Sequence, residues 1–211
     1  MAEVPRIIDL YHGDSVTSFD AARTAGLQAV IHKATTGASG RDNKYAERRS
    51  AALKSGLLWG AYHWGTAAPV VQQIDNFLQF ADPDKRTLVA LDFERTRGNQ
   101  MSIEQAAAFL KGIADKLGRK AVIYGGSLLK ESLGNSKNEF FGSHRLWLAQ
   151  YGDTPTPHKS WQDYWLWQYT DGGRNGPGPK KVPGVVGNTK GQIDCDQYRM
   201  PFAQLKAEWA S

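Results

Sequence analysis

An apolar run near the middle of the chain ends in two acidic residues that are separated by a single residue. Residues 87–94 read Thr-Leu-Val-Ala-Leu-Asp-Phe-Glu. Successive side chains of a strand point to opposite faces, so Asp92 and Glu94 share one face. A strand that is apolar on both faces is typical of a buried, parallel strand. Two carboxyl groups this close oppose each other's ionisation, which is costly unless they are used. The alternative is a strand end that runs into solvent.

Paired carboxyl groups among aromatic residues suit the hydrolysis of a glycosidic bond. One acid protonates the leaving oxygen, and another stabilises the oxocarbenium-like centre. The acid must hold its proton near neutral pH, and burial beside Asp92 would give Glu94 the raised pKa that this role needs. Cα atoms two positions apart on a strand are roughly 6.5–7 Å apart. Side-chain rotation blurs the separation of the carboxyl groups, so the spacing leaves retention and inversion of configuration open.

Aromatic rings suit the apolar faces of sugars, and the chain has seven Trp and eight Tyr. Aromatic side chains mostly pack in protein cores, so we expect about two or three of them to touch a ligand. The candidates in expected strands are Tyr62, Trp64, Trp147, Tyr151, Trp165, Trp167 and Tyr169.

The motifs of other hydrolytic chemistries are absent. Neither His-x-x-x-His nor Cys-x-x-Cys occurs, and Cys195 is the single cysteine, so we expect no metal, no cofactor and no internal disulfide. A Gly-x-Ser-x-Gly elbow is also absent. His32 and His63 lie in expected strands, and we interpret both as core residues.

Strands and helices alternate along the chain. The expected strands are residues 6–12, 29–33, 57–64, 87–94, 120–124, 145–151, 164–170 and 193–198. The expected helices are residues 18–26, 43–55, 70–80, 102–117, 127–133 and 202–209. Such alternation predicts right-handed βαβ units and a parallel sheet. We therefore expect one α/β domain, a closed barrel with an irregular last third, in which the Gly- and Pro-rich residues 172–191 form no regular element.

The active site of such a barrel lies at the carboxyl ends of its strands. Asp9, Asp92 and Glu94 all fall at or near expected strand ends, and Asp194 is a further candidate. This convergence strengthens the case for catalysis at the barrel mouth.

The net charge and the distribution of charged and apolar residues limit the classes of partner that the protein could bind. The net charge of +5 favours an anionic partner such as a bacterial envelope, whereas the scattered Lys and Arg disfavour nucleic acid. The sequence contains no run of about 18 apolar residues, so no membrane span is predicted. The first residues lack the basic-then-apolar pattern of a signal peptide, so we expect synthesis in the cytoplasm.

Taken in order, the motifs resemble glycoside hydrolase family 25, the Chalaropsis-type lysozymes or N-acetylmuramidases. The matching segments are residues 8–13, 31–37, 60–64, 91–94, 146–151, 166–170 and 193–196. Each segment is weakly specific alone, but the ordered set runs nearly end to end.

The resemblance implies a flattened, TIM-like (β/α)5(β)3 barrel that hydrolyses peptidoglycan glycan strands at the β-1,4 bond between N-acetylmuramic acid and N-acetylglucosamine. It implies Glu94 as the general acid/base and Asp92 as the group that assists the 2-acetamido group of the substrate, with retention of configuration. The substrate-binding residues expected from the matching segments are Asp9, Asp194, Tyr62, Trp64, Tyr124, Gln150, Tyr151, Trp167 and Gln168.

Two positions depart from the family pattern. The first motif continues with Leu10-Tyr11-His12 where a Ser and a Trp or His are usual, and Asp196 stands where Asn is usual. A single catalytic domain over residues 1–211, without wall-binding repeats, looks like a monomeric phage or prophage endolysin that a separate partner releases to the cell wall. A non-catalytic carbohydrate-binding protein and a chitinase-like hydrolase are the alternatives.

Overall fold

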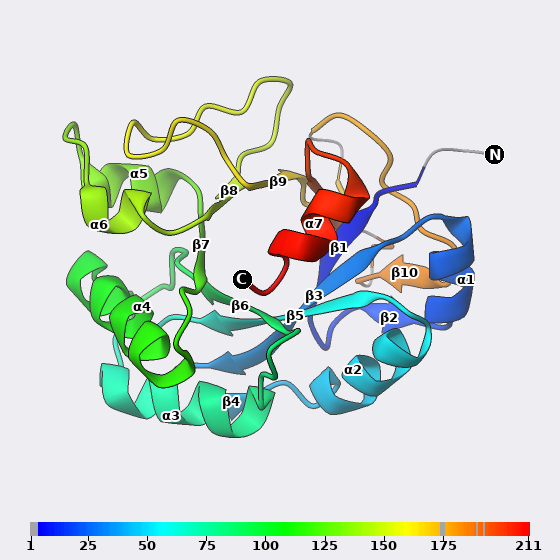
Figure 1. Cartoon of the computed structure of the whole chain (residues 1–211), viewed down its shortest axis with the longest axis horizontal. Coiled ribbons are helices and arrows are strands. Elements are labelled where there is room, and N and C mark those ends of the chain that lie inside the picture. The colour runs from blue at the N-terminus through cyan, green and yellow to red at the C-terminus, as the bar shows by residue number, and fades with distance from the viewer. Residues whose placement is uncertain (1–3, 174–175, 189, 192) are drawn as a thin grey trace.

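One sheet closes on itself to form the centre of the molecule. The structure is a computed structural model that describes residues 4–173, 176–188, 190–191 and 193–211. The sheet contains β1 (Ile7–Leu10), β3 (Ala29–Thr36), β4 (Gly40–Arg41), β5 (Leu58–Trp64), β6 (Leu88–Asp92), β7 (Val122–Gly125), β8 (Leu146–Ala149), β9 (Leu166–Thr170) and β11 (Asp194–Gln197). Its order is β1-β11-β9-β8-β7-β6-β5-β3-β4, and β1 also pairs with β3. All strands except β4 therefore form a closed, eight-stranded barrel (Figure 1).

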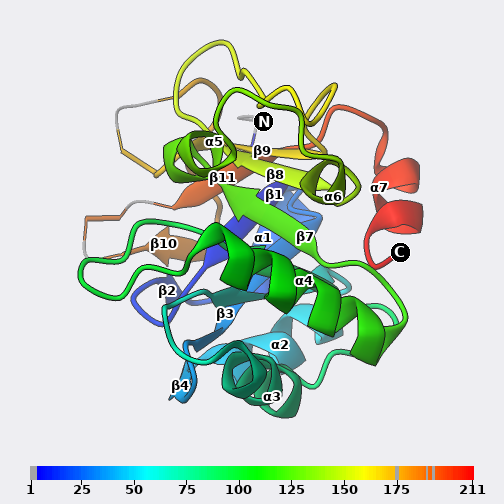
Figure 2. The ribbon, with the colours of Figure 1, turned by 90° about the vertical axis from the view of Figure 1, so that its left-hand side faces the viewer.

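The barrel strands are parallel except for β11, which runs antiparallel to both β1 and β9. Helices follow each of the first five barrel strands and cover the outside of the sheet (Figure 2). They are α1 (Phe19–Ala25), α2 (Tyr45–Lys54), α3 (Val70–Ala81), α4 (Ile103–Leu117), α5 (Ser127–Leu133) and the short α6 (Glu139–Gly142). In the described part of the chain, no helix separates β8, β9 and β11, so the predicted (β/α)5(β)3 barrel is confirmed.

Local sequence signals set the helix ends. The hydroxyl oxygen of Ser102 accepts a hydrogen bond from the backbone N–H of Gln105 at 3.2 Å, and the Gln105 side chain accepts one from the Ser102 N–H at 2.9 Å. This capping box satisfies two N–H groups that the start of α4 would otherwise leave unpaired, a contribution of about 1 kcal/mol per cap. Gly118 ends α4 with a φ of +67°, which favours glycine.

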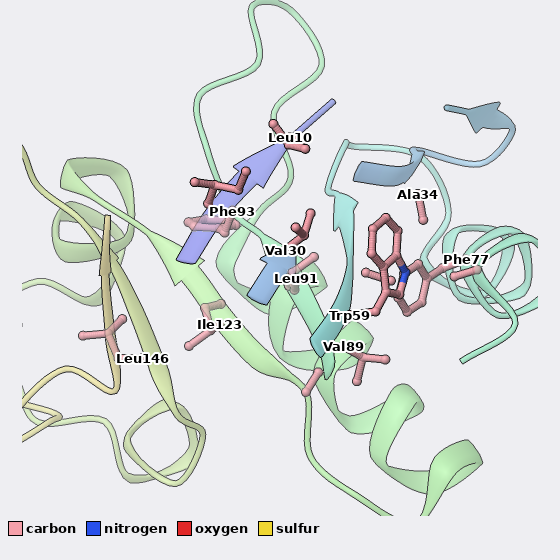
Figure 3. Packing of buried hydrophobic residues seen from close by; sticks show 14 of the residues in the cluster. Leu10, Val30, Ala34, Trp59, Phe77, Val89, Leu91, Phe93, Ile123 and Leu146 are labelled. Atoms are coloured by element: carbon pink, nitrogen blue, oxygen red, sulfur yellow. The ribbon is translucent and has the colours of Figure 1, made fainter. Parts of the chain in front are cut away.

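Alternation along the strands divides the core into two layers. Outward-pointing residues such as Val30, Val89 and Leu91 pack against the helices, where Phe77 of α3 meets them (Figure 3). A second layer fills the barrel with inward-pointing residues, among them Ile7, Ile31, Leu88, Ala90, Val122, Trp147 and Leu166. Each large side chain buried in this way contributes about 1.5–3 kcal/mol of hydrophobic free energy.

The C-terminal helix α7 (Phe202–Glu208) closes one end of the barrel. Leu205 and the following Trp209 belong to the interior layer, and the indole N–H of Trp209 donates to the backbone carbonyl of Trp59 at 2.7 Å. Trp59 lies near the start of β5, so this plug sits at the amino ends of the strands. The carboxyl ends are left as the open mouth.

Two sequence expectations were wrong in detail. Residues 172–191 contain the strand β10 (Val185–Gly187), which pairs antiparallel with β2 (Ser15–Val16). The pairing of β10 with β2 joins segments that are far apart in the chain, so no local sequence pattern predicts it. The strand β6 also ends at Asp92, which leaves Glu94 beyond the regular ladder. Among the described residues, no helix is long and apolar enough to cross a membrane.

Candidate active site

A cleft of about 160 Å³ opens at the carboxyl ends of the barrel strands. Its walls come from β1, β3, β5, β7, β8, β9 and β11 and from the end of β6. The lining residues are Asp9, Tyr11, Lys33, Tyr62, Trp64, Asp92, Glu94, Tyr124, Trp147, Gln168 and Asp194. The structure thus brings together residues that are spread over most of the sequence.

Strand register explains why four carboxyl groups meet in this cleft. Asp9 of β1 lies directly opposite Asp194 of β11. Asp92, the last residue of β6, lies between Trp64 of β5 and Tyr124 of β7. Glu94 stands two positions further on and lines the same cleft, in agreement with the shared face that the alternation predicted.

Burial dominates the electrostatics of Asp92 and Glu94. Asp92 is buried, and burial followed by the charge of Glu94 holds its pKa well above the usual value. Burial also raises the pKa of Glu94, while the hydroxyl of Tyr124 and the charge of Lys33 oppose the rise. The Oδ1 atom of Asp92 is buried, and none of the described residues donates a hydrogen bond to it. Burial therefore makes both acids hold a proton to higher pH than an exposed carboxyl group does.

Lys33 is the one basic side chain among the described residues that line the cleft. Its ammonium group lies 4.2 Å from the ring centroid of Trp64 and 5.7 Å from those of Tyr11 and Tyr62. Burial lowers its pKa, and the surrounding carboxylates, led by Asp92, act in the opposite direction. The aromatic rings and the carboxylates together stabilise the Lys33 ammonium group in its largely buried position.

A hydrogen-bond network crosses the cleft behind the acids. The side-chain amide N–H of Gln168 donates to Asp9 Oδ2 at 2.8 Å. The amide oxygen of Gln168 accepts from the hydroxyls of Tyr124 at 2.9 Å and Tyr151 at 3.0 Å. The Tyr124 hydroxyl also lies 3.3 Å from Glu94 Oε1. Asp9 and Glu94 are thereby connected through two neutral side chains.

Three of the expected substrate-binding residues, Gln150, Tyr151 and Trp167, are not among the residues that line the cleft. Trp167 belongs to the outer layer, because its neighbours Leu166 and Gln168 take the inward positions of β9. The Gln150 side chain turns into the loop that follows β8 and donates to the carbonyl of Thr154 at 3.0 Å. Tyr151 stays near the cleft through its bond to Gln168, with 41% of its surface exposed.

Trp165, another aromatic candidate, packs against the inner layer, whereas Trp167 and Tyr169 belong to the outer layer. It precedes β9 and packs against Trp209, which places it near the plugged end of the barrel. Lys33 and Tyr11 were missed as site residues. Alternation with the inward-pointing Ile31 and Asp9 was the signal that could have found them.

The histidines of the strands are structural. His63 contacts Thr35 Oγ1 at 2.7 Å and Gln73 Oε1 at 3.1 Å, and burial lowers its pKa to about 4. His32 is likewise buried and contacts the Lys33 carbonyl at 2.7 Å and Arg48 at 3.0 Å. Within the described residues, no group of three or more His, Cys, Asp or Glu side chains has the arrangement of a metal site.

An eight-stranded α/β barrel with buried carboxyl groups and aromatic rings at its mouth is the arrangement that glycosidic hydrolysis requires, which places the protein in the class of barrel glycoside hydrolases once its sequence is compared. The sequence model of glycosyl hydrolases family 25 matches residues 8–176, and the chain belongs to this family.

Two curated relatives of the chain are named as lysozymes. The autolytic lysozyme of Clostridium acetobutylicum is 26% identical over 197 residues, which cover 90% of this chain and 55% of the relative. Lysozyme M1 of Streptomyces globisporus is 25% identical over 215 residues, which cover 95% of this chain and 69% of the relative. The chain therefore spans little more than half the length of the first relative.

Solved structures match the whole barrel. The bacterial lysozyme from Streptomyces coelicolor superposes with a TM-score of 0.83 at 24% identity, over 100% of this chain and 99% of that chain. At that identity the likeness establishes the fold alone. A family GH25 lysozyme from Aspergillus fumigatus gives a TM-score of 0.77 at 26% identity, over 97% of this chain and 98% of that chain.

Proposed function

We propose that this chain is an N-acetylmuramidase, a lysozyme that hydrolyses the β-1,4 bond between N-acetylmuramic acid and N-acetylglucosamine in peptidoglycan. The observation that carries the proposal is the pair Asp92 and Glu94, two carboxyl groups of raised pKa on one wall of the cleft. The names of the matched relatives, lysozymes and a muramidase among them, support the substrate class.

Glu94 serves as the general acid and then as the general base. Its carboxyl group reaches the cleft and is partly shielded from solvent, so it retains a proton at a pH where a free Glu has lost it. It protonates the glycosidic oxygen as the C–O bond breaks. In the second step it removes a proton from the attacking water.

Asp92 assists the 2-acetamido group of the substrate. Its buried Oδ1 receives no hydrogen bond from the described residues, and an acetamido N–H is a donor suited to it. As the acetamido oxygen attacks the anomeric carbon, positive charge develops on the acetamido group, and a nearby carboxylate stabilises that charge. Water then opens the cyclic intermediate, which gives retention of configuration.

Tyr62 and Trp64 offer aromatic surfaces to the sugar rings, while Asp9 and Asp194 offer hydrogen-bond acceptors to sugar hydroxyls. We further propose that the chain works as a monomer, because one chain supplies every wall of the cleft. The proposed substrate, the bacterial cell wall, lies outside the cytoplasm. The net charge of +5 favours approach to an anionic envelope.

Replacing Glu94 with Gln tests the assignment, because the amide keeps the shape and removes the acidic proton. We expect clearing of purified peptidoglycan to fall at least about a hundredfold, the typical contribution of a general acid. Glu47→Gln, which changes an exposed carboxylate on α2, is the matched control and keeps full activity. Activity of Glu94→Gln within a few-fold of the parent would remove Glu94 from the reaction.

A further inference from the structure

Asp196 is a buried acid that the proposed reaction does not use. It lies on β11, where Cys195 packs in the outer layer and Asp196 points into the barrel. Its Oδ1 accepts a hydrogen bond from the indole N–H of Trp147 at 2.5 Å, and Trp147 forms part of the cleft wall. Its Oδ2 is buried, and no N–H group of the described residues reaches it.

Asp9 of β1 is the diagonal neighbour of Asp196 across the β1–β11 pairing, because Asp9 lies opposite Asp194 and Asp196 lies opposite Ile7. A side-chain hydrogen bond between the two carboxyl groups lowers the pKa of Asp196. Two carboxylates are both acceptors, so only a proton between them can pair the remaining oxygens. Burial, followed by the charge of Asp194, raises the pKa of Asp196 to about 8. Burial, followed by the charge of Asp196, raises the pKa of Asp9 well above its usual value.

Charged neighbours of this pair come from several elements. Asp194 on β11, Asp14 after β1 and Glu94 after β6 are acids, and each favours retention of the proton. Lys33 on β3 is the facing cation and acts against it. Gln168 on β9 and Trp147 on β8 are neutral donors to the two carboxyl groups.

We infer that Asp9 and Asp196 share a proton, and that Asp196 is a positioning residue which acts through Asp9, Gln168 and Tyr124 on the protonation of Glu94. This inference rests on the proposed role of Glu94 as the acid. It assigns a task to the carboxyl group at position 196, where the resemblance leads one to expect Asn.

The effect of the Asp9–Asp196 pair on Glu94 follows from a count of hydrogen-bond donors and acceptors. The shared proton leaves Asp9 Oδ2 as an acceptor, which directs the amide N–H of Gln168 toward Asp9 and the amide oxygen toward Tyr124. A tyrosine hydroxyl has one proton to donate. The Tyr124 hydroxyl oxygen lies 2.9 Å from Gln168 Oε1 and 3.3 Å from Glu94 Oε1, so these two acceptors compete for its proton.

The consequence falls on Glu94. A carboxylate that loses its hydrogen-bond donor is less stable in the ionised form, so the acid holds its proton to higher pH. When Glu94 is protonated, its O–H can donate to the Tyr124 oxygen, and every member of the network is paired. The buried pair therefore helps to keep the proposed acid in its reactive form.

Two variants of Asp196 separate positioning from simple packing. Asp196→Ala removes both the donor and the acceptor. We expect the alkaline limb of its pH profile for kcat/KM on peptidoglycan to move to lower pH, with kcat lowered about tenfold near neutral pH. Asp196→Asn keeps a donor toward Asp9 and an acceptor for Trp147, so it restores the position of the limb. An alkaline limb that stays in place in both variants overturns the positioning role.

The shared proton itself is tested without activity. The infrared difference spectrum of the parent minus Asp196→Asn at neutral pH should contain a protonated carboxylic-acid band, which the difference between the parent and the exposed control Asp115→Asn lacks. Thermal unfolding adds a second readout. The melting temperature of Asp196→Asn relative to the parent should rise by at least about 3 °C between pH 5 and pH 9. An unchanged acid band with parallel melting curves overturns the shared proton.

Failure of the proposed function is a different result. If the parent releases no sugar from peptidoglycan, the muramidase assignment is lost, while the infrared and melting measurements still decide whether Asp9 and Asp196 share a proton.

Discussion

The carboxyl group of Glu94 and the hydroxyl group of Tyr124 lie 3.3 Å apart, although 30 residues separate them in the chain. The contact arises because β6 and β7 are parallel neighbours, so that Asp92 lies opposite Tyr124 and Glu94 projects just beyond it. Tyr124 also donates to Gln168, which contacts Asp9. The proposed acid is thus one end of a buried network rather than an isolated side chain.

Asp92 should illustrate a conflict between stability and activity. Its buried, unpaired carboxyl oxygen destabilises the fold, so Asp92→Asn should raise the melting temperature at pH 8. The same change removes the charge that assists the acetamido group and should lower kcat about 100- to 1,000-fold. Calorimetry and a reducing-sugar assay measure the two effects. Asp75→Asn, on the exposed face of α3, should change neither, and a destabilised Asp92→Asn protein would contradict the account.

Lys33 should set the position of the pH optimum. Its charge lowers the pKa of both Asp92 and Glu94, so Lys33→Met should raise both values further. Because the mechanism needs Asp92 ionised and Glu94 protonated, both limbs of the pH profile for kcat/KM should move to higher pH. Lys44→Met, an exposed change, is the control. A shift to lower pH would show that another group governs the profile.

The buried acids should make the protein less stable at alkaline pH. Asp194, with a pKa raised to about 9, and Asp196, with one raised to about 8, bind protons more tightly when folded than when unfolded. Stability from such groups is fully present below the unfolded pKa of about 4 and is lost as the pH rises through the folded values. Melting temperatures should therefore fall from pH 5 to pH 9. A rise over that range would contradict the raised pKa values.

Two tryptophans should respond differently to substitution. Trp64 lines the cleft, so Trp64→Ala should raise KM about tenfold through the loss of a stacking surface worth roughly 1–3 kcal/mol. Trp167 packs in the outer layer, so Trp167→Phe should lower the free energy of unfolding by about 1–3 kcal/mol and leave KM unchanged. Michaelis profiles and chemical denaturation distinguish the two. An altered KM in Trp167→Phe would return that residue to the site.

Local patterns predicted most of the barrel and its central acids. Alternation at residues 87–94 was enough to assign Asp92 and Glu94 to the inner face, and the capping box at Ser102 marked the start of α4. These signals act between residues close in sequence, where geometry is fixed by the element itself.

Features that depend on pairing between distant strands were not predictable. Trp167 and Gln168 alternate, and only the place of β9 in the barrel decides which of them faces the cleft. Asp9 and Asp196 become diagonal neighbours only through the antiparallel register of β1 and β11, in which Asp9 lies opposite Asp194 and Asp196 lies opposite Ile7. The sequence around Asp9 or around Asp196 contains no pattern that predicts their proximity.

Mass spectrometry of digested, borohydride-reduced peptidoglycan tests the central claim most directly. The account predicts reduced muramic acid at the new chain ends for the parent and none above background for Glu94→Gln. Reduced glucosamine at those ends, or equal release by the two proteins, would contradict it.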